Sequence, residues 1–589
     1  MGRLFRTAML VSAGGLLASF SPPAIFSSSL LSALDPDQGG VLCGPRQMAR
    51  PLSRHILVAS AAAATPISRY KAMPLFKDLT GSRFPASTRN ILARRYMSQG
   101  LLLTYGFNHT GAVRSFREAQ RLDPECAACW WGEAVALGPN INAPMDERDR
   151  GAALNAVDRA MSLRDRATPL ERALIEAVAL RYSRDAQSDR AALDRAYADA
   201  MLAVARRFPL DDDVAVLAAE AVMDTSPWNY WESDKLTPVG RIGDAVALVE
   251  AVLSRNPDHP QAAHLYIHLM EASDPRRAEA AADRLTRTRP ATAGHLVHMP
   301  GHIYYGRGRY ADAIKVNVAA ARADEAYLRK TDDHSLVRYG YYPHNVHFIV
   351  TSAQMAGDMR TAIRESRRLR TILDPATSAR IAWIQAIDAA PYLAMAQFAR
   401  AQDILALPTA DPRLPYAVGM RHYARAIAHA QNKDRTSFEA ELAAIVALKR
   451  SGRLATMVEQ GVPALDLLSL AEAVARGRFA VHEGRYDHAI VRFRDAALIE
   501  SRLPYNEPPY WSYPVQQSLG AALFLAGRFE EANQAFRATL VRAPHNGWAL
   551  YGLSRSEAAA GHRAEAAAAH RSFAKTWIGD RSWLSMERL

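Results

Sequence analysis

Residues 519–544 decide the fold and read LGAALFLAGRFEEANQAFRATLVRAP. Apolar residues recur at helical spacing on both sides of a turn at Gly527, and Pro544 ends the second run. Small residues such as Gly520 let two helices approach closely, and Phe536 fills the gap between them. The stretch therefore predicts two antiparallel helices joined by a tight turn.

The same pattern recurs with a period of 34 residues. It returns at the end of the chain as Leu553, Gly561, Ala566 and Phe573, one unit earlier as Ala489, Phe493 and Ala496, and near the start as Ala112, Phe116, Ala119 and Pro124. These residues resemble the tetratricopeptide repeat over residues 90–589, most clearly at 93–135, 240–370 and 470–575. The resemblance implies an all-α, right-handed superhelical solenoid of antiparallel helix pairs, whose first helices line a concave groove.

Composition and linkers divide the chain into segments. We expect a leader and disordered segment at 1–75, a linker at 76–92, N-terminal repeats at 93–275, central His-rich repeats at 276–380, an irregular helical segment at 381–470, and C-terminal repeats with a capping helix at 471–589.

The first 75 residues have the layout of an export signal. Met1 opens a short basic start, followed by an apolar stretch and then Ser and Pro. A second layout of this kind begins at Met48, so either Met1 or Met48 is the true start. We expect a periplasmic or secreted bacterial protein after signal cleavage, with a disordered tail as the alternative.

Charge and length exclude several classes of protein. Lys and Arg number 72 against 60 acidic residues, but Arg is scattered and has acids nearby, which argues against nucleic-acid binding. No apolar run after residue 60 is long enough to span a membrane. Three Cys in 589 residues exclude a disulfide scaffold. Cys126 and Cys129 form a CxxC whose role stays open between a redox pair, a structural disulfide and ordinary packing.

Histidine is concentrated in the middle of the chain. Nine of the 18 His lie between residues 259 and 347. In the repeat frame, His295, His298, His302 and Tyr305 fall at the groove-facing positions of one unit, and His344 and His347 at those of the next. The spacings i, i+3, i+7 and i, i+3 each define one helix face without any family argument. Pro300 interrupts the helix that carries His298 and His302.

This pattern predicts a metal site. His264 and His268 are one turn apart, and Glu271 lies one turn further, so the three share a helix face. Imidazole and carboxylate suit copper, zinc or iron. The predicted ligands are His264, His268, Glu271, His295, His298, His302, His344 and His347. His109, Asp324 and Glu325 are possible additional ligands.

Two other interpretations stay open. Each His could be an ordinary core residue with a single hydrogen bond. Alternatively, the cluster, together with Arg307, Arg309 and Arg338, could hold an acidic peptide or a carboxylate ligand. Predicted groove residues for such a ligand are Tyr305, Tyr342, Trp228 and Trp231.

Several strings are more particular than a generic repeat. They include residues 105–109, 126–130, 294–300 and 342–347. Together they resemble a group of exported bacterial tetratricopeptide proteins without established activity. Members of that group often carry His-His-Phe-Pro before the first repeat, whereas this chain reads Gly81-Ser-Arg-Phe-Pro85.

Two functions follow from these observations. The first is a binding scaffold for a protein or peptide partner or a small acidic ligand, with a His-lined central groove that binds a transition metal or that acidic ligand. The alternative is a metalloenzyme, in which an open coordination position activates water or oxygen. The phosphate-loop, HExxH and GxSxG motifs are absent from the sequence, so no common enzyme signature supports the metalloenzyme over the scaffold.

Overall fold

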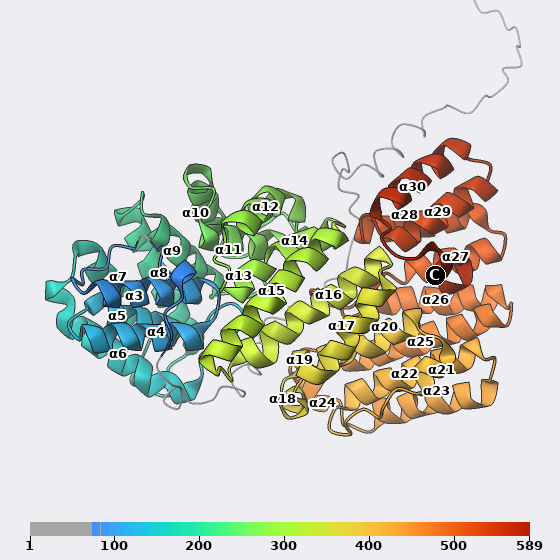
Figure 1. Cartoon of the computed structure of the whole chain (residues 1–589), viewed down its shortest axis with the longest axis horizontal. Helices are drawn as coiled ribbons and strands as arrows, with labels where there is room; N and C mark the ends of the chain where they lie inside the picture. Colours follow the sequence, from blue (N-terminus) through green and yellow to red (C-terminus); the bar gives the residue numbers. More distant parts are fainter. Residues whose placement is uncertain (1–72, 83) are drawn as a thin grey trace, which may run out of the picture. The chain divides into compact units, whose positions relative to one another are not determined.

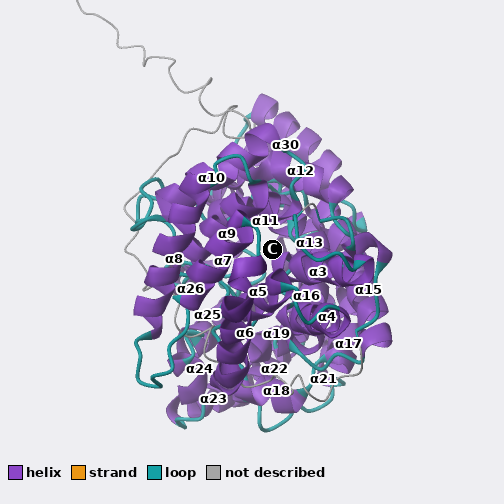
Figure 2. Ribbon diagram, turned by 90° about the vertical axis from the view of Figure 1, so that its left-hand side faces the viewer, coloured by secondary structure: helices purple, strands orange, loops and turns teal. Residues whose placement is uncertain are grey.

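A computed structural model describes residues 73–82 and 84–589, and the predicted leader lies almost entirely outside this range. The described residues belong to one compact unit and contain helices and loops but no β-strand, apart from two isolated bridges (Figure 2). None of their helices combines the length and apolarity needed to cross a membrane. The chain is thus an all-α protein, as the sequence predicts.

Figure 1 shows the helices in chain order. The first part contains α3 (Ile91–Tyr105), α4 (His109–Leu122), α5 (Ala127–Ala136), α6 (Arg150–Leu163), α7 (Pro169–Ala179), α8 (Arg190–Arg207), α9 (Asp212–Met223), α10 (Ile242–Arg255), α11 (Pro260–Met270) and α12 (Glu279–Thr288). The middle contains α13 (Gly294–His298), α14 (Pro300–Gly306), α15 (Tyr310–Thr331), α16 (Tyr342–Ala356), α17 (Met359–Ile372), α18 (Pro375–Arg380), α19 (Ala382–Asp388) and α20 (Ala390–Phe398). The last part contains α21 (Ala401–Leu405), α22 (Pro415–Gln431), α23 (Arg435–Arg450), α24 (Ala455–Glu459), α25 (Ala464–His482), α26 (Tyr486–Glu500), α27 (Gln516–Leu525), α28 (Phe529–Arg542), α29 (Gly547–Ala559) and α30 (Arg563–Thr576).

Consecutive helices pack against each other as pairs, for example α3 with α4, α25 with α26, and α27 with α28. A phenyl ring is wedged between small residues in several pairs. A Cβ added at Gly520 would lie 2.9 Å from the ring of Phe536, and one at Gly552 would lie 2.3 Å from it. Gly100 and Gly132 frame Phe116 in the same way. The helix pairs are therefore those of a tetratricopeptide-like repeat array.

The segment predicted as a linker, and the end of the predicted leader before it, pack into the core. Met73, in the predicted leader, is buried, and the Phe76 ring of the predicted linker stacks on Tyr327 with ring centroids 5.8 Å apart. Phe84 stacks on Trp131 at 5.2 Å. Buried aromatic area of this kind contributes strongly to stability. The residues before the first repeat thus join it to the central helices.

The C-terminal repeats contact the central ones through α16. The Trp548 indole N–H donates to the Gln354 carbonyl at 2.9 Å, and the Ile578 amide donates to the Ala356 carbonyl at 3.2 Å. The Trp577 ring covers Gly357, whose φ of 77° no larger side chain favours. Trp577 also packs on Trp548. Contacts that are distant in sequence therefore surround the helix that carries His344.

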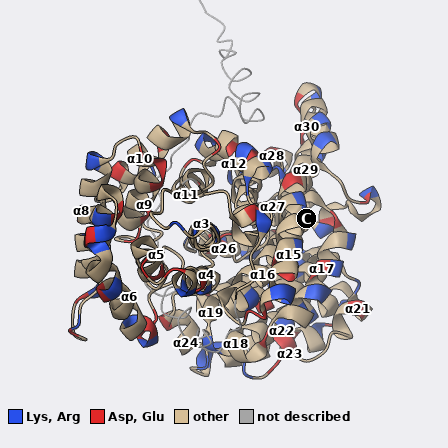
Figure 3. Ribbon diagram, turned by 60° about the vertical axis from the view of Figure 1, so that its left-hand side comes forward, with Lys and Arg blue, Asp and Glu red and all other residues tan. Residues whose placement is uncertain are grey.

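Charged residues of both signs are interspersed along the helices (Figure 3). Many form short-range pairs, such as Arg528 with Glu531 at 2.6 Å. Cys126 and Cys129, whose pairing the sequence leaves open, form a disulfide at the start of α5.

The aromatic wedge yields a test of the fold. Replacing Gly552 by Ala places a methyl group against the Phe536 ring, so we expect the free energy of unfolding to fall by about 1–3 kcal/mol. Gly151 in α6 has nothing within 4 Å of an added Cβ, so Gly151→Ala should be neutral or gain up to about 1 kcal/mol. Urea unfolding followed by circular dichroism measures the free energy of unfolding of both variants. Equal changes in the two variants would contradict the close packing of Phe536 against Gly552.

Candidate metal centre

The histidines of the central repeats come from α11, α13, α14 and α16. Pro300 begins α14. The helix is interrupted at Met299, although the backbone there keeps helical angles, so His298 ends one short helix and His302 lies in the next. The break does not separate them, because their ring centroids are 4.6 Å apart. The predicted interruption at Pro300 is present, and it leaves both imidazoles on the same side.

Six histidines gather into two groups. Group A is His264, His268 and His295, and group B is His298, His302 and His344. Within each group, one ring nitrogen per residue lies within 4.8 Å of the others. Three imidazoles at this separation are a suitable set of protein ligands for a transition ion.

The two groups are adjacent. The ring centroids of His268 and His302 are 6.0 Å apart, and those of His295 and His298 are 5.9 Å apart. Five of the six side chains are buried, and His344 is half-buried. We expected these residues to line an open groove, but the structure buries them because other segments cover them.

Aromatic rings form the cover. The Phe107 ring lies 4.6 Å from that of His264, and the Phe348 ring lies 4.8 Å from that of His298. Trp228 meets His268 edge-on at 5.1 Å. Phe107 and Trp228 both have positive φ angles, 53° and 62°, which large side chains rarely adopt. Backbone strain of this kind concentrates at functional sites.

Polar partners fix the orientation of group A. His264 Nδ1 lies 2.9 Å from the Gln261 side-chain oxygen, and His268 Nδ1 lies 2.7 Å from Glu271 Oε1. An Nδ1 that donates to an oxygen leaves Nε2 with a free lone pair. The Nε2 of His268 has no partner among the described residues. Partners of this type commonly orient metal-binding imidazoles.

Group B follows the same rule. His298 Nδ1 lies 2.6 Å from the Asn317 side-chain oxygen, and His302 Nδ1 lies 2.6 Å from Glu271 Oε2. The His302 contact is a close approach rather than an aligned hydrogen bond. Asn317 lies 16 residues after Gly301, which is the spacing of Phe536 from Gly520, and a Cβ at Gly301 would meet its amide nitrogen at 2.5 Å. The wedge position of this repeat is therefore occupied by an amide that orients a histidine.

Glu271 connects the groups, because its two oxygens face His268 and His302. The Tyr505 hydroxyl also donates to Oε2, at 3.3 Å. Burial alone would raise the pKa of Glu271, but His302 and His268 outweigh it and lower the pKa to about 2. The carboxylate is therefore ionised in the core.

The Nε2 atoms of four histidines face one another in two pairs. His298 Nε2 and His302 Nε2 are 2.7 Å apart, and His264 Nε2 and His295 Nε2 are 3.2 Å apart. One ring of each pair satisfies the other if it carries its proton on Nε2, and the Nδ1 atoms of His295 and His302, which have no hydrogen-bond partner among the described residues, permit this. If instead every Nδ1 carries the proton, two lone pairs face each other, and a cation between them relieves the repulsion. Burial, reinforced by neighbouring histidines, lowers the pKa of His264, His295 and His298 far below the usual value, so a positively charged ring is disfavoured. Two nitrogens bound to one tetrahedral zinc would lie about 3.3 Å apart.

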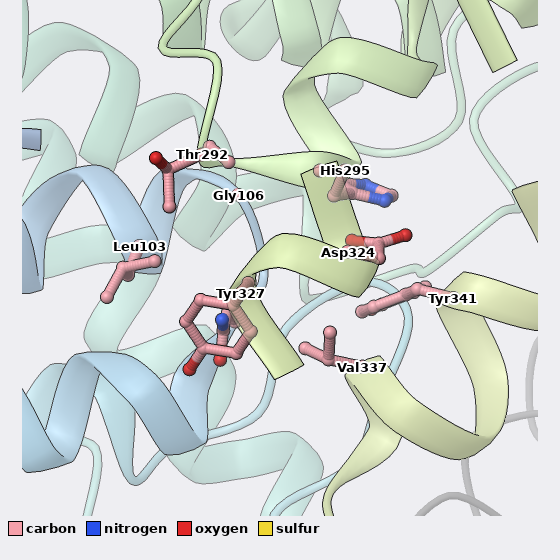
Figure 4. A pocket seen from close by; sticks show the side chains of 11 residues that line it. Leu103, Gly106, Thr292, His295, Asp324, Tyr327, Val337 and Tyr341 are labelled. Carbon is pink, nitrogen blue, oxygen red and sulfur yellow. The ribbon is translucent and has the colours of Figure 1, made fainter. Parts of the chain in front are cut away.

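A cavity of about 10 Å³, the size of one water molecule, adjoins His295. Figure 4 shows the His295 ring, the Asp324 carboxyl and Tyr341 around it. His295 Nδ1 has no hydrogen-bond partner among the described residues. Burial raises the pKa of Asp324 to about 8, and Asn345 donates to its Oδ2 at 2.7 Å.

Other predicted residues lie outside the two groups. His347 is half-buried and joins neither, although burial lowers its pKa to about 4. His109 approaches Asn140 at 3.2 Å. The Tyr342 hydroxyl donates to Glu325 at 2.7 Å, on the side of α16 that faces Arg368. Two predicted groove residues, Tyr305 and Trp231, also make internal contacts: Tyr305 packs on Tyr310 and Phe348, and the Trp231 indole donates to the Leu269 carbonyl.

Sequence reasoning missed the partners that orient the rings. Gln261 lies three residues before His264 on one helix face, and Asn317 stands where the repeat has an aromatic residue, so the sequence could have identified both as partners of the histidines. Nothing in the sequence around Phe107 and Tyr505 indicates that they contact the histidine site, since only the folded chain brings them there.

No family model and no curated protein matches the chain. Among solved structures, the human IFIT1 dimer with m7Gppp-AAAA is 11% identical, with 81% of this chain and 95% of that chain covered and a TM-score of 0.30. The TPR domain of P58(IPK) is 12% identical, with 80% and 98% covered and a TM-score of 0.21. The APC/C hetero-tetramer Cut9-Hcn1 is 12% identical, with 84% and 89% covered and a TM-score of 0.23. At these values the likeness concerns helical repeats alone, so function rests on the site.

The lowered histidine pKa values predict a pH effect in metal-free protein. Below pH 6.5 the histidines of the unfolded chain bind protons, whereas the buried imidazoles of the folded protein stay neutral. The contribution of these histidines to the free energy of unfolding therefore falls as the pH falls. Buried acids with a raised pKa, such as Asp324, make the folded protein more stable as the pH falls. The contribution of the histidines is therefore measured by comparing wild type with a variant that lacks one of them. We expect the stability gap between wild type and His298→Asn to narrow by about 1 kcal/mol per pH unit below 6.5. Urea unfolding after chelator treatment measures it. His488→Asn, at the surface, is the control, and a constant gap for His298→Asn would contradict the neutral buried ring.

Proposed function

We propose that this helical-repeat protein binds two transition-metal ions, one in group A and one in group B. The observation that carries the proposal is the common orientation of His264, His268, His298 and His302. Each has its Nδ1 beside a side-chain oxygen, which leaves Nε2 directed into its group. An ordinary buried histidine needs one hydrogen bond. In group A the Nε2 atoms of His264 and His295 can bond to each other, but His268 Nε2 beside them has no partner among the described residues, and a cation would bind all three.

Ligand chemistry limits the metal. Three imidazoles and no thiolate suit copper, zinc or iron, and among divalent ions copper binds nitrogen ligands most tightly. A site of hard oxygen ligands for magnesium or calcium does not fit. Copper, zinc and iron are therefore the ions to test.

Three protein ligands leave a coordination position open on each ion, as in catalytic rather than structural zinc sites. This supports the second candidate, a metalloenzyme in which the ion activates water or oxygen. A helical-repeat array also serves as a scaffold, so a protein or peptide partner or a small acidic ligand remains part of the proposal. Export to the periplasm or the medium is proposed from the first 75 residues, and the Cys126–Cys129 disulfide is compatible with an oxidising compartment.

Metal content tests the proposal directly. Untagged protein loaded with copper(II) or zinc and then desalted should hold two ions per chain by elemental analysis. His298→Ala should remove the ion of group B and leave one, and the double variant His295→Ala, His298→Ala should lose both. His488→Ala, at an exposed position, should keep two. Metal-free wild-type protein after this loading would contradict the proposal, whatever partner it binds.

Glu271 provides a sharper test because it faces both groups. Glu271→Gln keeps the shape but removes the charge that the Nδ1 atoms of His268 and His302 face. We expect the affinity for both ions to fall by about 10- to 100-fold, as for other partners of metal-binding imidazoles. Competition with a chromophoric chelator measures both constants. Glu325 accepts from Tyr342, pairs with Arg368 and belongs to neither group, so Glu325→Gln should change neither constant. A loss confined to one ion would show that Glu271 serves a single group.

A further inference from the structure

The two groups are adjacent and largely buried. Two pairs of rings, His268 with His302 and His295 with His298, approach across the boundary with centroids about 6 Å apart. Phe107 covers group A and Phe348 covers group B. Ions held here would be close to each other and shielded from water, so their mutual repulsion would be strong.

The protein supplies little charge to balance them. Imidazoles bind metals in the neutral form, so the six ligands contribute none. Glu271 is the carboxylate that touches the ligands, and it contributes a single negative charge. Two divalent ions carry four positive charges, so a fully loaded centre would retain a net charge of about +3, and buried charge needs a compensating partner.

The neighbouring acids are not bonded to the predicted ligands. The Asp324 carboxyl is held by Asn345, and burial raises its pKa to about 8. Glu507 lies beyond Tyr505, and burial, reinforced by the charge of Glu271, raises its pKa as well. Its Oε1 has no hydrogen-bond partner among the described residues. Among the described residues, no hydrogen bond or ion pair joins Asp324 or Glu507 to a histidine of either group, so Glu271 is the acid that faces the ligands.

We propose that the centre takes up a small anion together with its second divalent ion. This inference rests on the proposed metal binding. The open coordination positions provide the place for the anion, and the unbalanced positive charge provides the attraction. Phe107, Phe348 and Trp228 pack on the histidines, and the cavity beside His295 measures only about 10 Å³, so the anion must be small. Hydroxide, halide and small oxyanions share this chemistry.

The test uses zinc and sodium azide with the full chain. In chloride-free buffer at pH 7, we expect one zinc ion to bind tightly and the second at least tenfold more weakly. Azide at millimolar concentration should strengthen binding of the second ion at least tenfold and of the first less than threefold. Benzoate, which has one charge but is larger, should have no effect. With copper(II), azide should add a ligand-to-metal charge-transfer band.

Variants locate the effect. His298→Ala keeps only group A, so it should bind one ion with less than a threefold response to azide. Equal affinity for both ions without azide, and no change on adding it, would overturn the inference. It would also be overturned if anion-free binding of the second ion is strong and is lost in Asp324→Asn or Glu507→Gln, since a protein carboxylate would then be the partner. Protein that binds no zinc at all would contradict the proposed function itself, which is a distinguishable result.

Discussion

The contact between one buried carboxylate and two imidazoles holds the centre together. Glu271 directly follows α11, and its oxygens lie 2.7 Å from His268 and 2.6 Å from His302, which belongs to α14. An ionised carboxyl this deep in a protein is stable only when its partners compensate for lost hydration. These contacts therefore fix α11 and α14 relative to each other, and with them the positions of the histidine rings that the two helices carry.

The repeat itself provides the space for these rings. In other pairs a phenylalanine fills the gap between helices, as Phe116 does between Gly100 and Gly132. At the corresponding place in the central repeat stands Asn317, whose amide contacts Gly301 and accepts from His298. One substitution at a wedge position thus exchanges apolar packing for a polar network that only a complete set of partners can satisfy.

Much of this could be predicted from the sequence, because helical spacing fixes which residues share a face. The repeat register gave the helix pairs, and i, i+3 and i, i+4 spacings selected all six histidines that converge. Spacing could not show that they divide into two groups. That division depends on the interruption between α13 and α14 at Met299 and on how separate helices pack together. Nor could spacing separate His344 from His347, or show that Glu271 orients rings on two helices. The docking of Phe76 and Phe84 was equally hidden, because stacking across the fold has no periodic signature.

The reach of Tyr505 to Glu271 spans 234 residues of sequence. All the helices that carry the six histidines precede the loop of Tyr505 in the chain, so the contact forms only when a distant segment docks on them. If the protein folds after the proposed export, the whole chain is present before that docking. An ion of the proposed centre could then enter from this side until the loop closes over Glu271.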